Sequence, residues 1–123
     1  MELKKLYDLS GVNVLVTGGA GYLGTAISET IAEMDANLII CSRNYEKCKK
    51  LSEKLKIKYK TNIKAYQVDI GNSESVDSLY RTVKDDIGDI HVLINNAYFG
   101  AGKEFITMSD QEWSCGIEGS ING

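Results

Sequence analysis

The 123-residue sequence has no proline, a single histidine and only three cysteines. The absence of proline decides little. The cysteines, Cys41, Cys48 and Cys115, are odd in number and fit no metal-binding or redox spacing, so we expect neither a disulfide framework nor a metal centre. We expect reduced thiols and a cytoplasmic location. Cys41 lies in a strand-like run and is expected in the core.

Long apolar runs and an excess of positive charge are missing as well. No apolar stretch approaches the roughly 20 residues that a membrane span needs, and residues 1–5 lack the apolar stretch of a signal peptide. The net charge of -3 gives no reason to expect a nucleic acid as a partner. The length and the 43% of hydrophobic residues predict one soluble globular domain with a modest core.

Glycine, by contrast, is plentiful, and one glycine motif is the most informative feature of the sequence. Gly19, Gly21 and Gly24 have the spacing G-x-G-x-x-G, follow a strand-like run and open a helical pattern. In that setting the motif predicts a turn that binds a dinucleotide; the alternative is a turn that merely joins a strand to a helix. The glycines permit a tight turn, a close backbone approach to a pyrophosphate, and close packing of helix on strand. The helix N-terminus then presents N–H groups and a positive dipole end to the phosphates.

Strand-like apolar runs alternate with amphipathic helical stretches along the chain. Strands are expected at 12–17, 37–41, 63–68 and 92–95, and helices at 22–34, at about 45–57 and from the cap at 72–73 to Gly88. Continuous apolar runs are typical of strands buried on both faces of a parallel sheet. The order predicts a doubly wound, Rossmann-like α/β fold with a parallel sheet, and right-handed crossovers give the strand order 3-2-1-4.

The helical stretches carry apolar faces that we expect to turn inward. For the first three helices these positions are Leu23, Ile27, Ile31 and Met34; Cys48, Leu51 and Leu55; and Val76, Leu79, Tyr80, Val83 and Ile87. After a loop at 97–108, the S-x-x-E sequence at 109–112 predicts a capping box. A fourth helix follows, with Trp113, Ile117 and Ile121 on its inner face.

The end of the second strand indicates which dinucleotide is preferred. NAD-binding domains usually place Asp or Glu there, about 20 residues past the glycines, to accept from the ribose 2′-OH. This chain has Ser42, Arg43 and Asn44 instead. A hydroxyl and a guanidinium can bind a 2′-phosphate, and no carboxylate repels it. The sequence therefore favours NADP over NAD; the alternative is an Arg43 that only pairs near Glu46 at the surface.

Lysines crowd the second helix and the residues after it, at positions 47, 49, 50, 54, 56, 58 and 60. They form either a patch for an anion or a nucleic acid, or the solvated face of the helix, relieved by Glu46 and Glu53. We favour the solvated face, because a nucleic-acid footprint would normally shift the charge of the whole domain.

These motifs together resemble the short-chain dehydrogenase/reductase family. Residues 17–24 are similar to its glycine motif, Asp69-Ile70 resembles the acidic-apolar pair that holds adenine, and Asn95-Asn96-Ala97 resembles its N-N-A sequence. The resemblance implies that the backbone of the glycine turn lies under the pyrophosphate and that Asp69 accepts from the adenine amino group. It also implies that Asn95 steadies the central strand and that the Asn96-Ala97 backbone borders the ribose.

The predicted cofactor-binding residues follow from the glycine turn, the end of the second strand and these two motifs. They are Thr17, Gly19, Gly21, Tyr22, Leu23, Gly24, Ser42, Arg43, Asn44, Asp69, Ile70, Asn95, Asn96 and Ala97.

The chain also departs from the family pattern. Tyr22 stands where the single-domain branch has the middle glycine of T-G-x-x-x-G-x-G, and the spacing T-G-x-x-G-x-x-G is more typical of the extended branch. Tyr98 replaces the glycine after N-N-A, where it would cover the mouth of the site. His91 stands where an Asp is common, and we interpret it as structural. Counted from Trp113, Ser120 occupies the place of a catalytic Asn of the family.

The family's catalytic Ser and its Tyr-x-x-x-Lys pair lie beyond the helix at which this chain ends. In the family, that tyrosine is the general acid or base, and the lysine lowers its pKa. Tyr45 and Lys49 have the same spacing, but they lie after the second strand, away from the nicotinamide end, and we interpret the match as chance. We therefore expect residues 1–123 to be a single domain cut off within the family fold; the alternative is a minimal domain whose last helix frays.

Two functions are consistent with these features. The resemblance implies a parent oxidoreductase that transfers a hydride between nicotinamide and the carbonyl or secondary alcohol of a small molecule, with this chain as its NADP-binding half. The family often dimerises through the helix at which this chain ends, which leaves a homo-oligomer open. The alternative is a non-catalytic product that at most binds nucleotide and exposes the fourth strand as an apolar sheet edge.

Overall fold

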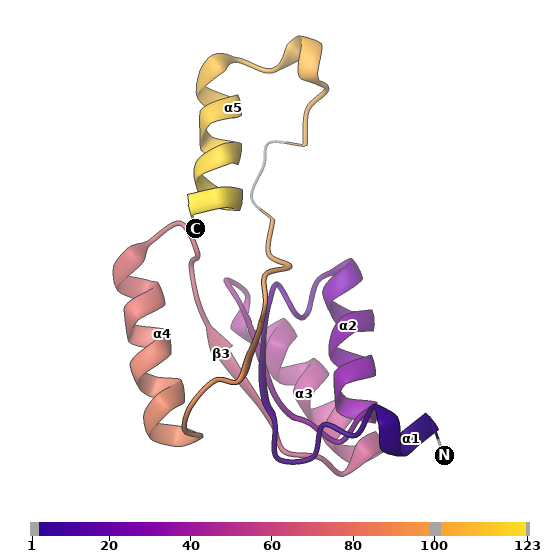
Figure 1. The fold of residues 1–123 in the computed structure, drawn as a ribbon. Coiled ribbons are helices and arrows are strands. Elements are labelled where there is room, and N and C mark those ends of the chain that lie inside the picture. The colour runs from indigo at the N-terminus through magenta and orange to yellow at the C-terminus, as the bar shows by residue number, and fades with distance from the viewer. Residues whose placement is uncertain (1–2, 99–101, 123) are drawn as a thin grey trace.

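The computed structural model describes residues 3–98 and 102–122, and Figure 1 shows their arrangement. Four parallel strands form one sheet in the order β3-β2-β1-β4, which confirms the predicted doubly wound α/β fold. The strands are β1 (Asn13–Thr17), β2 (Asn37–Ser42), β3 (Ile63–Gln67) and β4 (Val92–Ile94). The helices are α1 (Leu3–Leu6), α2 (Tyr22–Glu33), α3 (Tyr45–Tyr59), α4 (Ser73–Asp86) and α5 (Asp110–Ile117), with a 3-10 turn at Phe105–Thr107 and a π-helical turn at Glu118–Asn122.

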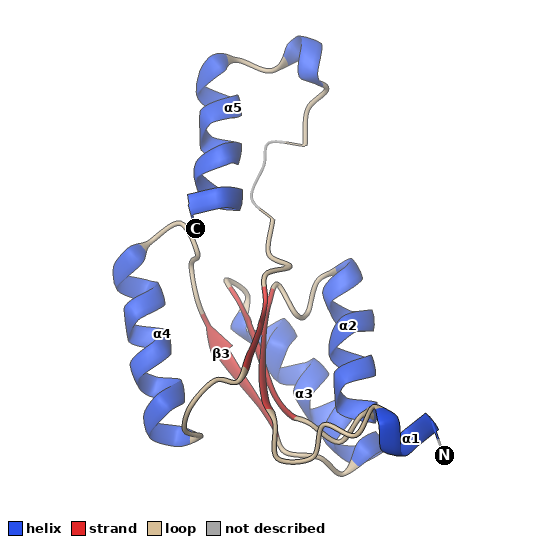
Figure 2. Cartoon of the chain, in the orientation of Figure 1, coloured by secondary structure: helices blue, strands red, loops and turns tan. Residues whose placement is uncertain are grey.

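Helices cover both faces of the sheet, with α2 and α3 on one face and α4 on the other (Figure 2). Because side chains alternate along a strand, Val14 and Val16 of β1 join the core under α2 and α3, whereas Leu15 joins the core under α4. Cys41 of β2 lies in the α4 core, which confirms its predicted burial. All of β1 is buried, so the central strand is covered on both sides.

A polar cluster fixes the strands at the amino end of the sheet. The Asn13 side chain is only 7% exposed; its Nδ2 donates to the carbonyl of Asp89 at 2.8 Å, and its Oδ1 accepts from Nδ2 of Asn37 at 2.9 Å. The backbone N–H of Asn13 donates to Nδ1 of His91 at 2.8 Å. His91 therefore has the structural role predicted for it, because it ties β1 to the segment that enters β4.

Local capping signals set the helix ends as predicted. Asn72 caps α4, since its Oδ1 accepts from the backbone N–H of Ser75 at 3.1 Å. Ser109 and Glu112 form the predicted capping box at the start of α5. Hydrogen bonds from Lys103 and from Ser109 lower the pKa of Glu112 to about 2. None of the described helices is long and apolar enough to cross a membrane.

The helices bury fewer residues than their apolar patterns predict. On α4, Leu79 and Val83 are buried one turn apart, whereas Val76 and Tyr80 are exposed. Leu23 is exposed as well, because the first turn of α2 lies past the carboxyl ends of the strands (Figure 1). The predicted inward positions are wrong for these three residues, since only a narrow stripe of each helix contacts the sheet.

The α5 helix stands apart from the sheet, beyond the carboxyl ends of the strands (Figure 1). Trp113 is 51% exposed, and Ile117 is exposed too. Their predicted inner position is wrong because no described surface of the sheet lies beneath them. Trp113 packs edge-on against Phe105 instead, with 5.6 Å between the ring centroids. The side chain of Ile121 lies outside the described part of the chain.

β4 forms one edge of the sheet, as the strand order predicts. Leu93 is 56% exposed, and Val92 is exposed beside it. The expected apolar edge at the fourth strand is therefore present.

Burial of two cysteines predicts selective thiol reactivity. Desolvation raises the pKa of Cys41 to about 12 and also raises that of Cys48, whereas Cys115 is exposed. Because the thiolate is the reactive form, we expect only Cys115 to react quickly with a chromogenic disulfide reagent in the folded chain, and all three thiols to react after unfolding. Cys115→Ser should remove the fast phase. Rapid labelling of Cys41 or Cys48 in the folded chain would contradict their burial.

Candidate functional site

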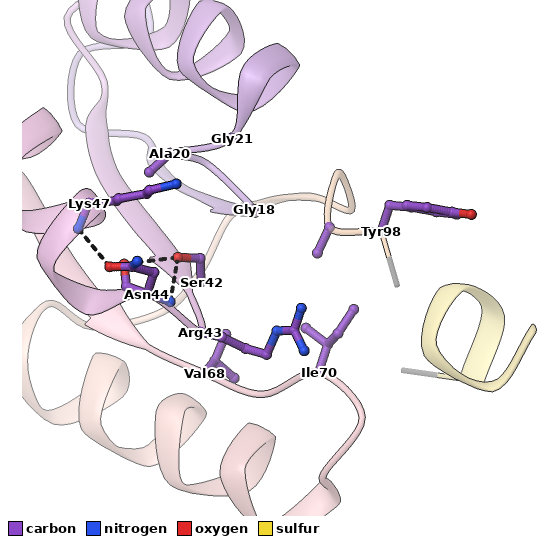
Figure 3. A pocket seen from close by; sticks show the side chains of 11 residues that line it. Gly18, Ala20, Gly21, Ser42, Arg43, Asn44, Lys47, Val68, Ile70 and Tyr98 are labelled. Atoms are coloured by element: carbon purple, nitrogen blue, oxygen red, sulfur yellow. Dashed lines mark hydrogen bonds between the residues drawn. The ribbon is translucent and has the colours of Figure 1, made fainter. Parts of the chain in front are cut away.

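A cavity of about 270 Å³ opens at the carboxyl end of the sheet, where the segments that follow all four strands meet. The lining residues come from the turns after β1 and β2 and from the segments after β3 and β4: Gly18, Ala20, Gly21, Ser42, Arg43, Asn44, Lys47, Val68, Ile70, Ala97 and Tyr98 (Figure 3). The chain runs from β1 to β2 on one side of the sheet and from β3 to β4 on the other. The cavity therefore lies at the switch point where open α/β sheets bind ligands.

Two positions at the turn between β1 and α2 have room for glycine only. Gly18 has φ +62°, and a Cβ there would lie 2.9 Å from the Cα of Ala97. A Cβ at Gly24 would lie 2.0 Å from the carbonyl oxygen of Gly18. The tight-turn glycine is therefore Gly18, one residue ahead of the predicted motif, whereas Gly24 permits the close packing of α2 that the motif predicts.

The first turn of α2 is open toward a ligand. Its N-cap is Gly21, and no side chain caps the helix. Behind the turn, the buried Ser28 hydroxyl donates to the carbonyl of Gly19 at 2.9 Å. The uncapped N–H groups and the positive end of the α2 dipole suit an anion at this position.

Thr17 and Asn96 join the glycine turn to the segment after β4. The Thr17 hydroxyl accepts from the backbone N–H groups of Asn96 and Ala97, each at 3.1 Å. The Asn96 side chain donates to the carbonyls of Thr17 at 3.2 Å and Gly18 at 3.1 Å. The Asn96 side chain therefore faces the end of β1, whereas Asn95 is exposed.

The turn after β2 forms the opposite wall of the cavity. Its backbone is held by β3, since Val68 N–H donates to the carbonyl of Ser42 at 3.0 Å and Gln67 Nε2 donates to that of Arg43 at 3.1 Å. Asn44 caps α3, and its Oδ1 accepts from the Lys47 N–H at 3.1 Å. The Arg43 side chain extends along the cavity toward Ile70 (Figure 3). No acidic residue is among the described residues that line the cavity.

The structure brings only part of the predicted site together. Six of the predicted residues line the cavity: Gly21, Ser42, Arg43, Asn44, Ile70 and Ala97. Four others lie behind the lining and support it through packing or hydrogen bonds: Thr17, Gly19, Gly24 and Asn96. Tyr22, Leu23 and Asn95 are exposed outside its lining. Asp69 is exposed as well, and its Oδ1 accepts from the Gly71 N–H at 3.0 Å.

The predicted set lacks five lining residues, Gly18, Ala20, Lys47, Val68 and Tyr98. Gly18 and Ala20 lie within the glycine turn and could have been included with it. Lys47 was not predicted because many lysines surround it in the sequence. Its position three residues past Asn44, the cap of α3, is the signal that could have placed it at the cavity. Tyr98 lies at the rim, where a covering side chain was expected (Figure 3).

Neither Y-x-x-x-K spacing of the sequence reaches the cavity. Tyr45 and Lys49 line a separate groove beside β3, which agrees with a chance match. A second match, which the sequence analysis missed, is Tyr80 and Lys84 on α4, where the Lys84 ammonium pairs with Asp89 at 3.3 Å. Among the described residues, no group of three or more His, Cys, Asp or Glu is arranged to hold a metal ion.

The crowding at Gly24 predicts a large difference between two similar substitutions. Gly24→Ala should lower the free energy of unfolding by about 3 kcal/mol, because its methyl group would overlap the Gly18 carbonyl. Gly21→Ala is the matched control: its Cβ would lie 3.2 Å from the same oxygen, and a cost below about 1 kcal/mol is expected. Denaturant titration measures both. Equal costs at the two positions would show that α2 does not depend on this contact.

Comparison with known proteins agrees with this geometry. Residues 12–123 match the short chain dehydrogenase family. The chain is 36% identical over 107 residues to the human protein named short-chain dehydrogenase/reductase 3, a match that covers 86% of this chain and 35% of that protein. It is 30% identical over 125 residues to the NADP-dependent mannitol dehydrogenase of Alternaria alternata, covering 99% of this chain and 47% of the relative.

Solved structures show the same partial coverage. L-Sorbose reductase from Gluconobacter frateurii, complexed with NADPH and L-sorbose, has a TM-score of 0.80 at 26% identity and covers 94% of this chain and 44% of its own. A metagenomic short-chain oxidoreductase in complex with NADP has a TM-score of 0.78 at 26% identity, with 90% and 50% covered. The chain thus spans half or less of the length of these relatives. Because the family match extends over nearly all of its residues, the chain belongs to the short chain dehydrogenase family.

Proposed function

We propose that this chain is the NADP-binding half of an oxidoreductase that transfers a hydride between nicotinamide and a carbonyl or secondary alcohol. The observation that carries the proposal is the wall after β2, where Arg43 lines a cavity that has no acidic side chain among its described lining residues. A carboxylate at this place would accept from the ribose hydroxyls of NAD and repel a 2′-phosphate. A guanidinium instead offers a charge-assisted fork to that phosphate.

The geometry of the glycine turn fits the rest of the cofactor. Because Gly18 and Gly24 have no side chains, the backbone of the turn can come close to a ligand. The uncapped start of α2 offers N–H groups to a pyrophosphate. Val68 and Ile70 supply an apolar surface on the β3 side for the adenine ring. As the family resemblance implies, Asp69 accepts from the adenine amino group, and the Asn96-Ala97 backbone borders the ribose. When bound, the cofactor supplies the hydride chemistry, and these residues supply position and electrostatics.

The relatives support this assignment without extending it to a substrate. The sorbose reductase and the metagenomic oxidoreductase were solved with NADPH and NADP, and the mannitol dehydrogenase is named as NADP-dependent. Their substrates need not be those of this chain, because the chain matches at most half of their length. We place the general acid or base, a Tyr-x-x-x-Lys pair in this family, outside these 123 residues.

A second candidate function is nucleotide binding without catalysis. It is favoured by the exposed apolar β4 edge and by the distance of both Y-x-x-x-K pairs from the cavity. The gene sequence downstream of Gly123 distinguishes the two: an in-frame Tyr-x-x-x-Lys supports the oxidoreductase, and a stop codon supports the binding product.

The cofactor preference can be tested at Arg43. We expect the chain to bind NADP more tightly than NAD, and Arg43→Asp to weaken NADP binding roughly 10- to 100-fold while sparing NAD, because a charged hydrogen bond to the phosphate is lost. Arg81→Asp on α4 is the matched control, since Arg81 lies on a different surface. Titration calorimetry with both nucleotides gives two affinities for each of the three proteins, six in all. Equal affinities for NADP and NAD in the wild type and in Arg43→Asp would remove the case for NADP.

Catalysis by these residues alone is a separate question. We expect the purified 123-residue chain to show no oxidation of NADPH above the blank with a panel of aldehydes, ketones and keto sugars, because no Tyr-x-x-x-Lys pair is among the described residues that line the cavity. The absorbance of NADPH follows the reaction. Steady turnover would mean that a group within these residues acts as the proton donor.

A further inference from the structure

We infer that Lys47, on the first turn of α3, is a second cation for the 2′-phosphate and acts opposite Arg43. This inference rests on the proposed function, because it concerns the part of the cavity that would receive that phosphate. It changes which residue partners Arg43: the sequence pointed to Ser42, whereas the contacts in the structure favour Lys47.

The Ser42 hydroxyl is already fully engaged inside its own turn. Its Oγ donates to the carbonyl of Asn44 at 3.1 Å and accepts from the Asn44 N–H at 3.2 Å. It also lies 3.1 Å from Sγ of Cys48, a buried thiol on α3. A hydroxyl has one hydrogen to donate and two lone pairs, and these three contacts use all of them. Ser42 therefore holds the turn and has no free hydrogen for a phosphate.

The Lys47 side chain enters the cavity from the other side. The backbone N–H of Lys47 is fixed by the Asn44 cap at 3.1 Å, and the side chain extends past Ser42 toward Ala20 of the glycine turn (Figure 3). Arg43 extends on the other side of Ser42, toward Ile70 (Figure 3). Both residues line the same cavity, so two positive charges flank the turn between them. A dianionic phosphate between two cations gains from both.

The other lysines of α3 are placed differently. Lys58 binds Glu29 of α2 at 2.6 Å, and this hydrogen bond lowers the pKa of Glu29. Lys49 and Lys56 line the groove beside β3. Lys47 is the exception: it lines the cavity, and no ion pair with a described carboxylate occupies its ammonium group. Lys47 is exposed like the other lysines of α3, but among those that the structure describes it alone lines this cavity.

The test compares nucleotides that differ only in the 2′-phosphate. Affinities of the 123-residue chain are measured by calorimetry for NADP, NAD, adenosine 2′,5′-bisphosphate and 5′-AMP. Lys47→Gln should weaken the two 2′-phosphorylated nucleotides roughly five- to tenfold and leave the other two unchanged, because it removes one charged contact. Lys47→Arg should keep most of the affinity. Raising the salt concentration should reduce the preference of the wild type for the 2′-phosphorylated nucleotides. It should also narrow the difference in NADP affinity between the wild type and Lys47→Gln.

Two further variants separate Lys47 from its surroundings. Lys49→Gln makes the same change two residues along α3, outside the cavity, and should alter none of the four affinities. Ser42→Ala should loosen the turn and lower the affinities for NADP and NAD alike; a loss confined to NADP would make Ser42 the phosphate ligand and overturn the inference.

The outcomes also distinguish the inference from the proposed function. If the wild type prefers NADP, and Arg43→Gln removes the preference while Lys47→Gln does not, the role of Lys47 is refuted and the proposed function stands. If the wild type binds none of the four nucleotides, the proposed function and the inference fail together.

Discussion

The site depends on one carbonyl oxygen, that of Gly18, against which the first turn of α2 packs. A Cβ at Gly24 would come within 2.0 Å of this oxygen, so helix and turn meet backbone to backbone. Asn96 donates to the same oxygen from the β4 side at 3.1 Å. The positions of α2, of the cavity rim at Ala97 and of the end of β1 are therefore coupled through one atom. A change at either contact, the packing of Gly24 or the hydrogen bond from Asn96, would move the anion-binding end of α2.

The sequence predicted the sheet well and the surface of the site less well, for physical reasons. Strand positions and their order follow from hydrophobic pattern and chain connectivity, which are local or general properties. The inner face of α5 was predicted wrongly because an apolar stripe at Trp113 indicates which side of a helix is apolar. It does not indicate whether another part of the fold packs against that side. Lys47 was missed because its reach into the cavity depends on how α3 docks. The sequence likewise does not reveal that the Ser42 hydroxyl already has all of its hydrogen-bond partners within the turn.

Two kinds of electrostatics meet in the cavity. The glycine turn contributes dipoles, the N–H groups and the positive end of α2, which act over a short distance and carry no net charge. The β2–α3 turn contributes full charges on mobile side chains, Arg43 and Lys47, which reach further but are screened by salt. A chain of net charge -3 thus concentrates positive potential at one end of its sheet without becoming basic as a whole.

The position of β4 has a consequence for folding. β1 pairs with β2 across 24 residues of chain but with β4 across 78, and the longer closure costs about 1 kcal/mol more in chain entropy. β4 is also short and covered on one edge only. We expect it to join the sheet last and to open first. Each opening would withdraw Asn96 from the Gly18 carbonyl, so the lifetime of the cavity rim is set by the fraying of a three-residue strand.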